Sequence, residues 1–168
     1  MTGPRPAPSR PSQCAGSPTR RAWRSATSTP ARSGTGSVVC WGRNADGQLG
    51  DGTLTSRLTP AEVPGLTDVA RVALDGSHSC AVRRDGLVLC WGRNDFGQLG
   101  DGTLVNRRSP TVTPVTDAAA VETGPRHTCA LRRSGAVACW GANNAGQLGL
   151  GTLSDTVPAP RAAVFGLP

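Results

Sequence analysis

Short apolar runs separated by turn residues dominate the sequence from residue 37 onward. Val82 and the run Leu87–Leu89 flank the dipeptide Asp85-Gly86, and a similar arrangement surrounds Ser134-Gly135. Such dipeptides between apolar runs are typical of β-hairpins. No stretch of three helical turns carries apolar residues at a 3.6-residue period, so helices are not expected. The pattern predicts an all-β domain.

The same pattern recurs as an internal repeat. Three segments align without gaps: CWGRNADGQLGDGTL at 40–54, CWGRNDFGQLGDGTL at 90–104 and CWGANNAGQLGLGTL at 139–153. A hairpin block precedes the last two, HSCAVRRDGLVLC at 78–90 and HTCALRRSGAVAC at 127–139, and no first copy of this block is found near residues 28–40. A proline follows each Gly-Thr-Leu, at Pro60, Pro110 and Pro158. Repeats of about 40–50 residues built from short strands predict β-propeller blades.

The motif Trp-Gly-x-Asn-x-x-Gly-Gln-Leu-Gly-x-Gly-Thr, preceded by His-[Ser/Thr]-Cys-Ala, resembles the regulator of chromosome condensation repeat, in particular its bacterial, cysteine-containing branch. The resemblance covers residues 37–168 and implies blades of a propeller that has seven in this family. About three repeats are present, so we expect an incomplete β-propeller with open strand edges at both ends. Such a chain is either a fragment of a longer repeat protein or a unit that self-associates through those edges.

The first 36 residues have a different composition. They carry six arginines and no acidic residue, so six of the seven net positive charges lie here, together with six of the 14 prolines. Such a segment buries too little apolar surface to offset its chain entropy, and we expect residues 1–36 to be disordered. This basic tail is the one part that could contact nucleic acid, which is otherwise an unlikely partner. The alternative is an extension without function.

Most recurring residues of the motif are expected to be structural. Each tryptophan-glycine pair is expected to pack between neighbouring blades, and each Leu of Gln-Leu-Gly to fill a blade core. Each Gln is expected to hydrogen-bond loop backbone that would otherwise be buried unpaired. His78 and His127 lack a recurring acidic partner and do not match zinc-ligand spacing, which favours a structural role. The pairs are Trp41-Gly42, Trp91-Gly92 and Trp140-Gly141, with Leu49, Leu99, Leu148 and Gln48, Gln98, Gln147.

The cysteines recur at a fixed spacing. A three-residue loop with Gly86 or Gly135 in the left-handed conformation places Cys80 opposite Cys90 and Cys129 opposite Cys139. Directly opposed residues lie within disulfide range, so two disulfides are predicted, with buried reduced thiols as the alternative.

Two cysteines have no partner in this scheme. Cys40 would face Pro30 and Cys14 lies in the tail, so both are expected to be free. Disulfides would favour an extracellular or cell-envelope location if the start is truncated. The sequence as it stands has no secretory signal and favours the cytoplasm.

The three loop motifs differ from one another at few positions. These are Arg43/Arg93/Ala142, Ala45/Asp95/Asn144 and Asp46/Phe96/Ala145. Variation inside a fixed frame is what a partner-facing surface shows, although sequence drift explains it equally well. Phe96 is the one large apolar residue among them and is the candidate anchor. The candidate partner-binding residues are Arg43, Asp46, Arg93, Asp95, Phe96 and Asn144.

These features favour a non-catalytic scaffold for protein–protein interaction. The sequence contains no nucleophile–base–acid set, no cofactor motif and no metal-ligand spacing, and no apolar run long enough to span a membrane. Three alternatives remain open. The family resemblance implies a guanine-nucleotide exchange factor-like regulator of a small GTPase or a propeller-type enzyme inhibitor, and the irregular first repeat fits a non-functional truncated gene product.

Overall fold

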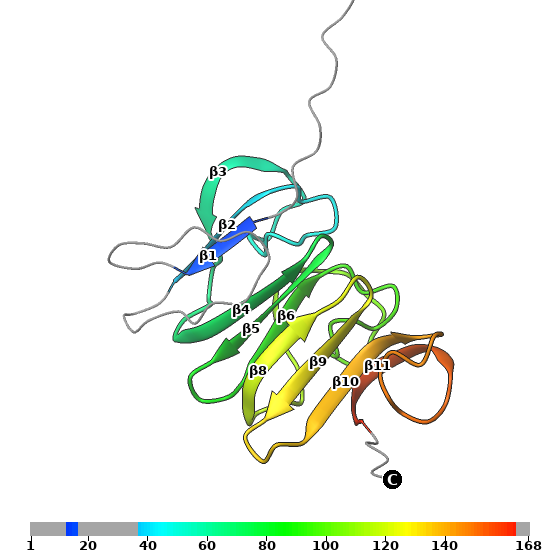
Figure 1. Ribbon diagram of the computed structural model, residues 1–168. Helices are drawn as coiled ribbons and strands as arrows, with labels where there is room; N and C mark the ends of the chain where they lie inside the picture. Colours follow the sequence, from blue (N-terminus) through cyan, green and yellow to red (C-terminus); the bar gives the residue numbers. More distant parts are fainter. Residues whose placement is uncertain (1–12, 17–36, 164–168) are drawn as a thin grey trace, which may run out of the picture.

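The computed structural model describes residues 13–16 and 37–163, and its elements are all β-strands (Figure 1). None of the described elements is a helix that could cross a membrane. The strands are β1 (Gln13–Gly16), β2 (Val38–Gly42), β3 (Arg57–Glu62), β4 (Val69–Asp75), β5 (His78–Arg83), β6 (Val88–Gly92), β7 (Arg107–Val112), β8 (Ala118–Thr123), β9 (His127–Arg132), β10 (Val137–Asn143) and β11 (Ser154–Ala162). The all-β prediction is confirmed.

The strands form three antiparallel sheets, which are consecutive blades of a partial propeller. The first blade has the order β1-β2-β3, the second β4-β5-β6-β7 and the third β8-β9-β10-β11. β8 packs against β4 and β5, and β1 contacts β4, so the blades stack side by side (Figure 1). β3, β7 and β11 lie at the opposite edges of their sheets. The predicted incomplete propeller is confirmed.

The hydrophobic core lies mainly between the blades. Leu49 of the first blade packs in one cluster with Ala81 and Trp91 of the second. The next boundary repeats this arrangement, with Leu99 packed in one cluster with Ala130 and Trp140. In the middle blade, β6 is buried along its whole length, whereas the residues of the outer strand β7 are exposed or only partly buried. Trp91 and Trp140 thus lie between blades, and Leu49 and Leu99 lie there with them rather than inside a blade core.

Both complete hairpins have the register that the sequence predicts. The Arg83 N–H donates to the Leu87 carbonyl at 2.9 Å, and the Arg132 N–H donates to the Ala136 carbonyl at 2.8 Å. Gly86 and Gly135 have φ of +95° and +88°, a conformation that glycine adopts without steric cost. The two predicted disulfides are present, Cys80–Cys90 and Cys129–Cys139.

The prediction for the first blade is wrong in two respects. Residues 13–16, assigned to the disordered tail, form β1 and pair with β2. The register places Cys14 opposite Cys40, not Pro30, and Cys40 is disulfide-bonded rather than free. The reason is that the first hairpin is split by a long insertion, so its two strands are distant in sequence. The other tail residues, 1–12 and 17–36, lie outside the described residues.

The recurring prolines lie on the outer strands. Val63, Thr113 and Ala163 each donate their N–H inward to the neighbouring strand. Backbone N–H groups alternate in direction along a strand, so positions 60, 110 and 160, three residues earlier, face the free edge of the sheet. A proline at such a position leaves that edge without an N–H donor. This arrangement discourages pairing with another chain. The third equivalent proline is thus Pro160, and the sequence-based choice of Pro158 is wrong because the third loop is one residue longer.

Removing a hairpin disulfide is expected to lower stability without changing the fold. Each closes a loop with a sequence separation of 10 residues. The chain-entropy model gives about 2–3 kcal/mol for a loop of this size. We expect Cys129→Ser/Cys139→Ser to lower the free energy of unfolding by this amount in urea. Non-reduced peptide mapping of the wild-type chain tests the pairing, and a peptide joining Cys80 to Cys129 would contradict it.

Candidate protein-interaction surface

Five connections come together at one end of the blades. Within a blade, β4 and β6 are both antiparallel to β5, so the turn after β4 and the long loop after β6 leave from the same end. The same topology holds for β8 and β10. The loop end thus carries the motif loops 43–56, 93–106 and 144–153 and the short turns after β4 and β8. The hairpin tips at Gly86 and Gly135 lie at the other end.

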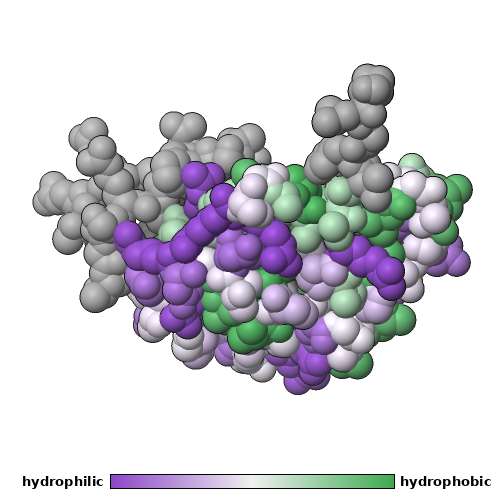
Figure 2. Space-filling view, turned by 90° about the horizontal axis from the view of Figure 1, so that it is seen from below, coloured by the Kyte–Doolittle hydropathy of each residue, from purple (hydrophilic) through white to green (hydrophobic). Residues whose placement is uncertain are grey.

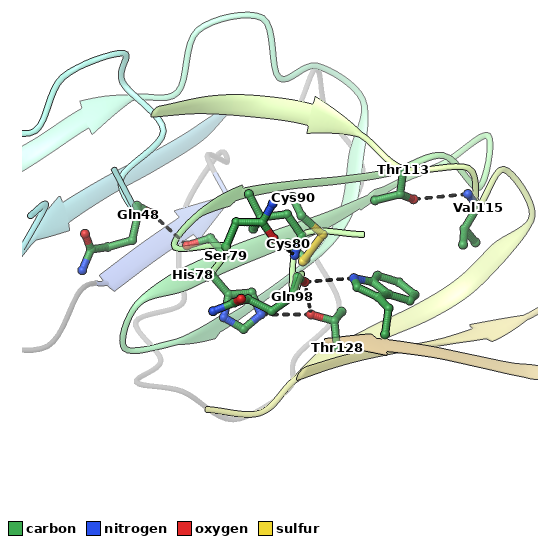
Figure 3. Close-up of a disulfide and its surroundings, with 12 residues drawn as sticks. Gln48, His78, Ser79, Cys80, Cys90, Gln98, Thr113, Val115 and Thr128 are labelled. Atoms are coloured by element: carbon green, nitrogen blue, oxygen red, sulfur yellow. Dashed lines mark hydrogen bonds between the residues drawn. A yellow bond between two sulfur atoms is a disulfide. The ribbon is translucent and has the colours of Figure 1, made fainter. Parts of the chain in front are cut away.

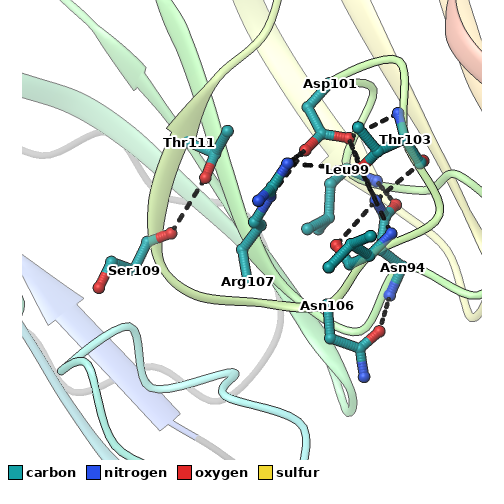
Figure 4. Close-up of polar contacts among 9 residues, drawn as sticks. Asn94, Leu99, Asp101, Thr103, Asn106, Arg107, Ser109 and Thr111 are labelled. Carbon is teal, nitrogen blue, oxygen red and sulfur yellow. Dashed lines mark hydrogen bonds and ion pairs between the residues drawn. The ribbon is translucent and has the colours of Figure 1, made fainter.

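A buried asparagine organises each motif loop (Figure 4). The Asn94 Nδ2 donates to the carbonyls of Thr103 at 3.0 Å and Val105 at 3.2 Å, and its Oδ1 accepts from the Leu99 N–H at 2.9 Å. Asn44 makes the corresponding bonds in the first loop. A loop of this length buries many backbone groups, and the asparagine supplies partners that no strand provides. The loops are consequently rigid platforms.

An ion pair closes the first two loops. Asp101 is almost fully buried and bonds Arg107 Nε at 2.8 Å and the Thr103 hydroxyl at 2.7 Å (Figure 4). Burial alone would raise the pKa of Asp101, but the hydrogen bonds from Thr103 and Arg107 outweigh it and hold that pKa below its ordinary value. Asp51 and Arg57 form the same pair in the first loop.

The motif glutamine joins neighbouring blades through its backbone carbonyl. The Gln48 carbonyl accepts from Ser79 Oγ at 2.9 Å (Figure 3). It also accepts from Trp91 Nε1 at 2.9 Å. The Gln98 carbonyl accepts from Thr128 Oγ1 at 2.8 Å and from Trp140 Nε1 at 2.9 Å. The glutamine side chains bond loop backbone as predicted, for example Oε1 of Gln98 to the Phe96 N–H at 2.9 Å.

The two histidines occupy equivalent positions but differ in burial. His78 is buried at the boundary with the third blade, with Nε2 2.9 Å from Thr128 Oγ1 (Figure 3). The Thr128 hydroxyl donates to the Gln98 carbonyl, so His78 must donate to Thr128 through a protonated Nε2. Burial lowers the pKa of His78 to about 4, and the nearby His127 charge adds to this. His127 is half-buried, and its pKa is lowered by the same effect.

Acid is expected to weaken the boundary between the second and third blades. The unfolded His78 binds a proton near pH 6.5, whereas the folded one stays neutral to about pH 4. The free energy of unfolding therefore falls as the pH drops through this window, by about 3 kcal/mol for this group. Urea melts of the wild type and His78→Gln should converge as the pH falls from 7 to 4.

A matched variant separates this effect from general acid unfolding. His127→Gln removes the half-buried equivalent and should change the pH dependence less. Asp75 acts in the opposite direction, since burial raises its pKa and the His127 charge lowers it only in part. Because His127→Gln also removes the charge that lowers the pKa of Asp75, the comparison of His78→Gln with the wild type carries the test. A constant difference between His78→Gln and the wild type across the window would contradict the prediction.

The structure places the predicted partner-binding residues on these loops and pairs most of them within each loop. Arg43 lies 3.2 Å from Asp46, and Arg93 lies 2.6 Å from Asp95. Asn144 is exposed and accepts from Gln147 Nε2 at 3.2 Å. The surface thus presents ion pairs on the first two loops and neutral residues on the third.

Phe96 has a partner that the sequence analysis missed. The Arg126 guanidinium carbon lies 4.7 Å from the centre of the Phe96 ring, a cation–π geometry. Arg126 comes from the turn after β8, so this contact bridges the second and third blades. Beneath it, Gln98 Nε2 is buried without a hydrogen-bond partner among the described residues. Gln48 Nε2 donates to the Gly76 carbonyl instead, and the third blade replaces Gly76-Ser77 by Pro125-Arg126.

The loop motif and its blades match one family. Residues 35–82 and 85–131 match the regulator of chromosome condensation (RCC1) repeat, and 70–98 and 118–147 match a second description of that repeat. The chain belongs to the RCC1 repeat family. No curated protein sequence matches the chain significantly.

Solved structures show the same fold. Human WBSCR16 is 27% identical with a TM-score of 0.67, over 76% of this chain and 35% of that protein. Prp20p from Saccharomyces cerevisiae, in a study of its binding to Gsp1p and histones, is 24% identical with a TM-score of 0.66, over 77% and 34%. Yeast RCC1 (Prp20) bound to Kap60 is 21% identical with a TM-score of 0.67, over 79% and 32%. This chain thus spans about a third of their length.

Proposed function

We propose that the chain is a non-catalytic scaffold that binds a protein partner through the loop end of its second and third blades. The observation that carries the proposal is the Phe96–Arg126 pair, which sets a partly buried aromatic ring and an exposed cation on a hydrogen-bonded frame. Aromatic and arginine side chains are the residue types that most often dominate binding energy. The frame beneath them is fixed by Asn94 and Gln98, so little ordering is needed on binding.

The charge pattern around this pair supports the same surface. The ion pair of Arg93 with Asp95 lies on the Phe96 loop, with both side chains nearly half exposed. Exposed pairs of this kind contribute little to stability and are available to exchange partners. The partner would accordingly offer an apolar or aromatic side chain with a carbonyl or carboxylate nearby.

Partner capture with matched variants tests the proposal. The immobilised full chain is incubated with extract of its source organism, and bound proteins are quantified for the wild type, Phe96→Ala, Arg126→Gln and Leu131→Ala. Leu131 is also an exposed apolar residue but lies near the hairpin-tip end, which makes it the control. We expect Phe96→Ala to reduce the specific partner about tenfold or more, as for a binding hot spot. Equal capture by all four proteins would overturn the proposal.

A further inference from the structure

The third loop departs from the first two at both residues of the buried ion pair. Leu150 occupies the motif position of Asp51 and Asp101. Arg57 pairs with Gly42 and Arg107 with Gly92, and the residue that pairs with Gly141 is Val157. The acid and the base are therefore both replaced by aliphatic residues. Leu150 and Val157 pack in one cluster with Cys139 and Leu148.

A hollow lies beside these two positions and runs along β11. The hollow has a volume of about 940 Å³. Its lining is mixed, with six apolar residues, three hydroxyl-bearing residues and one arginine; the residues are Leu150, Thr152, Ser154, Thr156, Val157, Pro158, Ala159, Pro160, Arg161 and Ala162. In the second loop the same region holds the Arg107 side chain against Asp101 (Figure 4). Figure 2 shows apolar residues at the surface on the side of the molecule where the third blade lies.

The charge of the lining is one-sided. Arg161 is exposed, and its side chain makes no hydrogen bond or ion pair within residues 37–163. No acidic residue lines the hollow. By contrast, the cations next to the first two loops, Arg57 and Arg107, are each bound to an aspartate. The hollow thus combines apolar side chains with an exposed arginine that has no ion-pair partner within residues 37–163.

We propose that this hollow binds an apolar side chain of a partner polypeptide that carries a carboxylate on the neighbouring residue. The apolar group would contact Leu150 and Val157, and the carboxylate would pair with Arg161. The proposal rests on the proposed scaffold function, since it gives the scaffold a second contact point on another blade. Edge pairing along β11 does not explain the hollow, because Pro160 removes an outward N–H from that edge.

Nuclear magnetic resonance titration of the ¹⁵N-labelled full chain tests the site without knowledge of the partner. The probes are N-acetyl-Phe-Asp-amide and its neutral counterpart N-acetyl-Phe-Asn-amide. We expect both to shift the amides of Val157 and Ala159, with the aspartate peptide binding about threefold to tenfold more tightly, as for one exposed ion pair. Arg161→Gln should remove that preference and leave the affinity for the neutral peptide unchanged.

A second variant restores the ion pair of the other loops. Leu150→Asp/Val157→Arg should fill the hollow and abolish the shifts for both peptides. Phe96→Ala should leave them unchanged, so failure of the loop-end surface and failure of this site are distinguishable. Shifts that map elsewhere, or that persist in Leu150→Asp/Val157→Arg, would overturn the proposal.

Two other occupants would also overturn it. Dimerisation that Val157→Arg abolishes in sedimentation would assign the hollow to a second copy. A rise in peptide affinity on deletion of residues 164–168 would assign it to the chain's own end.

Discussion

Replacing Gly100 with alanine is expected to lower the free energy of unfolding by about 4 kcal/mol. Gly100 has φ of +71°, and a Cβ there would lie 2.6 Å from Trp140 Nε1 and 2.8 Å from two ring carbons. The ring is fully buried and its Nε1 donates to the Gln98 carbonyl, so it cannot move aside without losing that bond. The substitution should separate the second and third blades.

Gly149 is a matched control at the same motif position. It has φ of +64°, but its nearest neighbour would be Ala163 Cβ at 3.7 Å, an ordinary contact. Gly149→Ala therefore carries only the backbone cost of about 1 kcal/mol. Urea unfolding followed by tryptophan fluorescence compares the two. Equal losses of unfolding free energy in the two variants would show that backbone strain, and not the contact with Trp140, accounts for the cost of replacing Gly100.

Local signals in the sequence were sufficient for the hairpins. The turns at Gly86 and Gly135 fix which residues face each other, and the cysteine pairing follows from that register. Each hairpin spans few residues, so the prediction needs no knowledge of the rest of the fold. The bond from the motif glutamine side chain to its own loop was equally predictable, because donor and acceptor lie within one repeat, as for the Phe96 N–H and Gln98 Oε1.

The first hairpin could not be found in this way because its strands are far apart in the sequence. β1 lacks the His and Ser/Thr that mark the other copies, and residues 17–36 separate it from β2. One signal was available: Cys14-Ala15 matches Cys80-Ala81 and Cys129-Ala130. Its value becomes clear only when Cys14 is seen opposite Cys40.

Apart from the position of the tryptophans, contacts between blades were beyond sequence reasoning. Val82 and Leu131 occupy the same position in nearly identical strands, yet Val82 is 2% exposed and Leu131 43%. The difference arises because the third blade covers Val82, whereas none of the described residues buries Leu131 to the same extent. Arg126 reaches Phe96 for the same reason, since a turn of one repeat meets the loop of the preceding one. The candidate surface is thus a property of neighbouring repeats together.

Asn94→Ala is expected to cost about 4 kcal/mol, because it removes several hydrogen bonds at once and leaves buried groups unpaired. The Leu99 N–H loses its acceptor, and the carbonyls of Thr103 and Val105 lose a donor. Asn143 is the natural comparison, with bonds to the Thr152 carbonyl and the Leu148 N–H. Asn143→Ala should cost about half as much. Equal losses of unfolding free energy for Asn94→Ala and Asn143→Ala in urea would contradict the role assigned to the additional hydrogen bonds of Asn94.

Substitution of the same asparagines by aspartate separates charge from hydrogen bonding. Asn94 Nδ2 lies 3.2 Å from Asp101 Oδ1, so Asn94→Asp places two carboxylates in contact, whereas the corresponding neighbour of Asn143 is Leu150. Close carboxylates raise the pKa of one of them in the folded state. The loss caused by Asn94→Asp, relative to the wild type, should therefore be largest at pH 7 and shrink as the pH falls toward about 4, where the unfolded carboxyl also protonates. Asn143→Asp meets no second carboxylate, and its loss should depend less on pH. Parallel pH profiles of unfolding free energy for the two variants would show that repulsion by the Asp101 carboxylate does not cause the loss in Asn94→Asp.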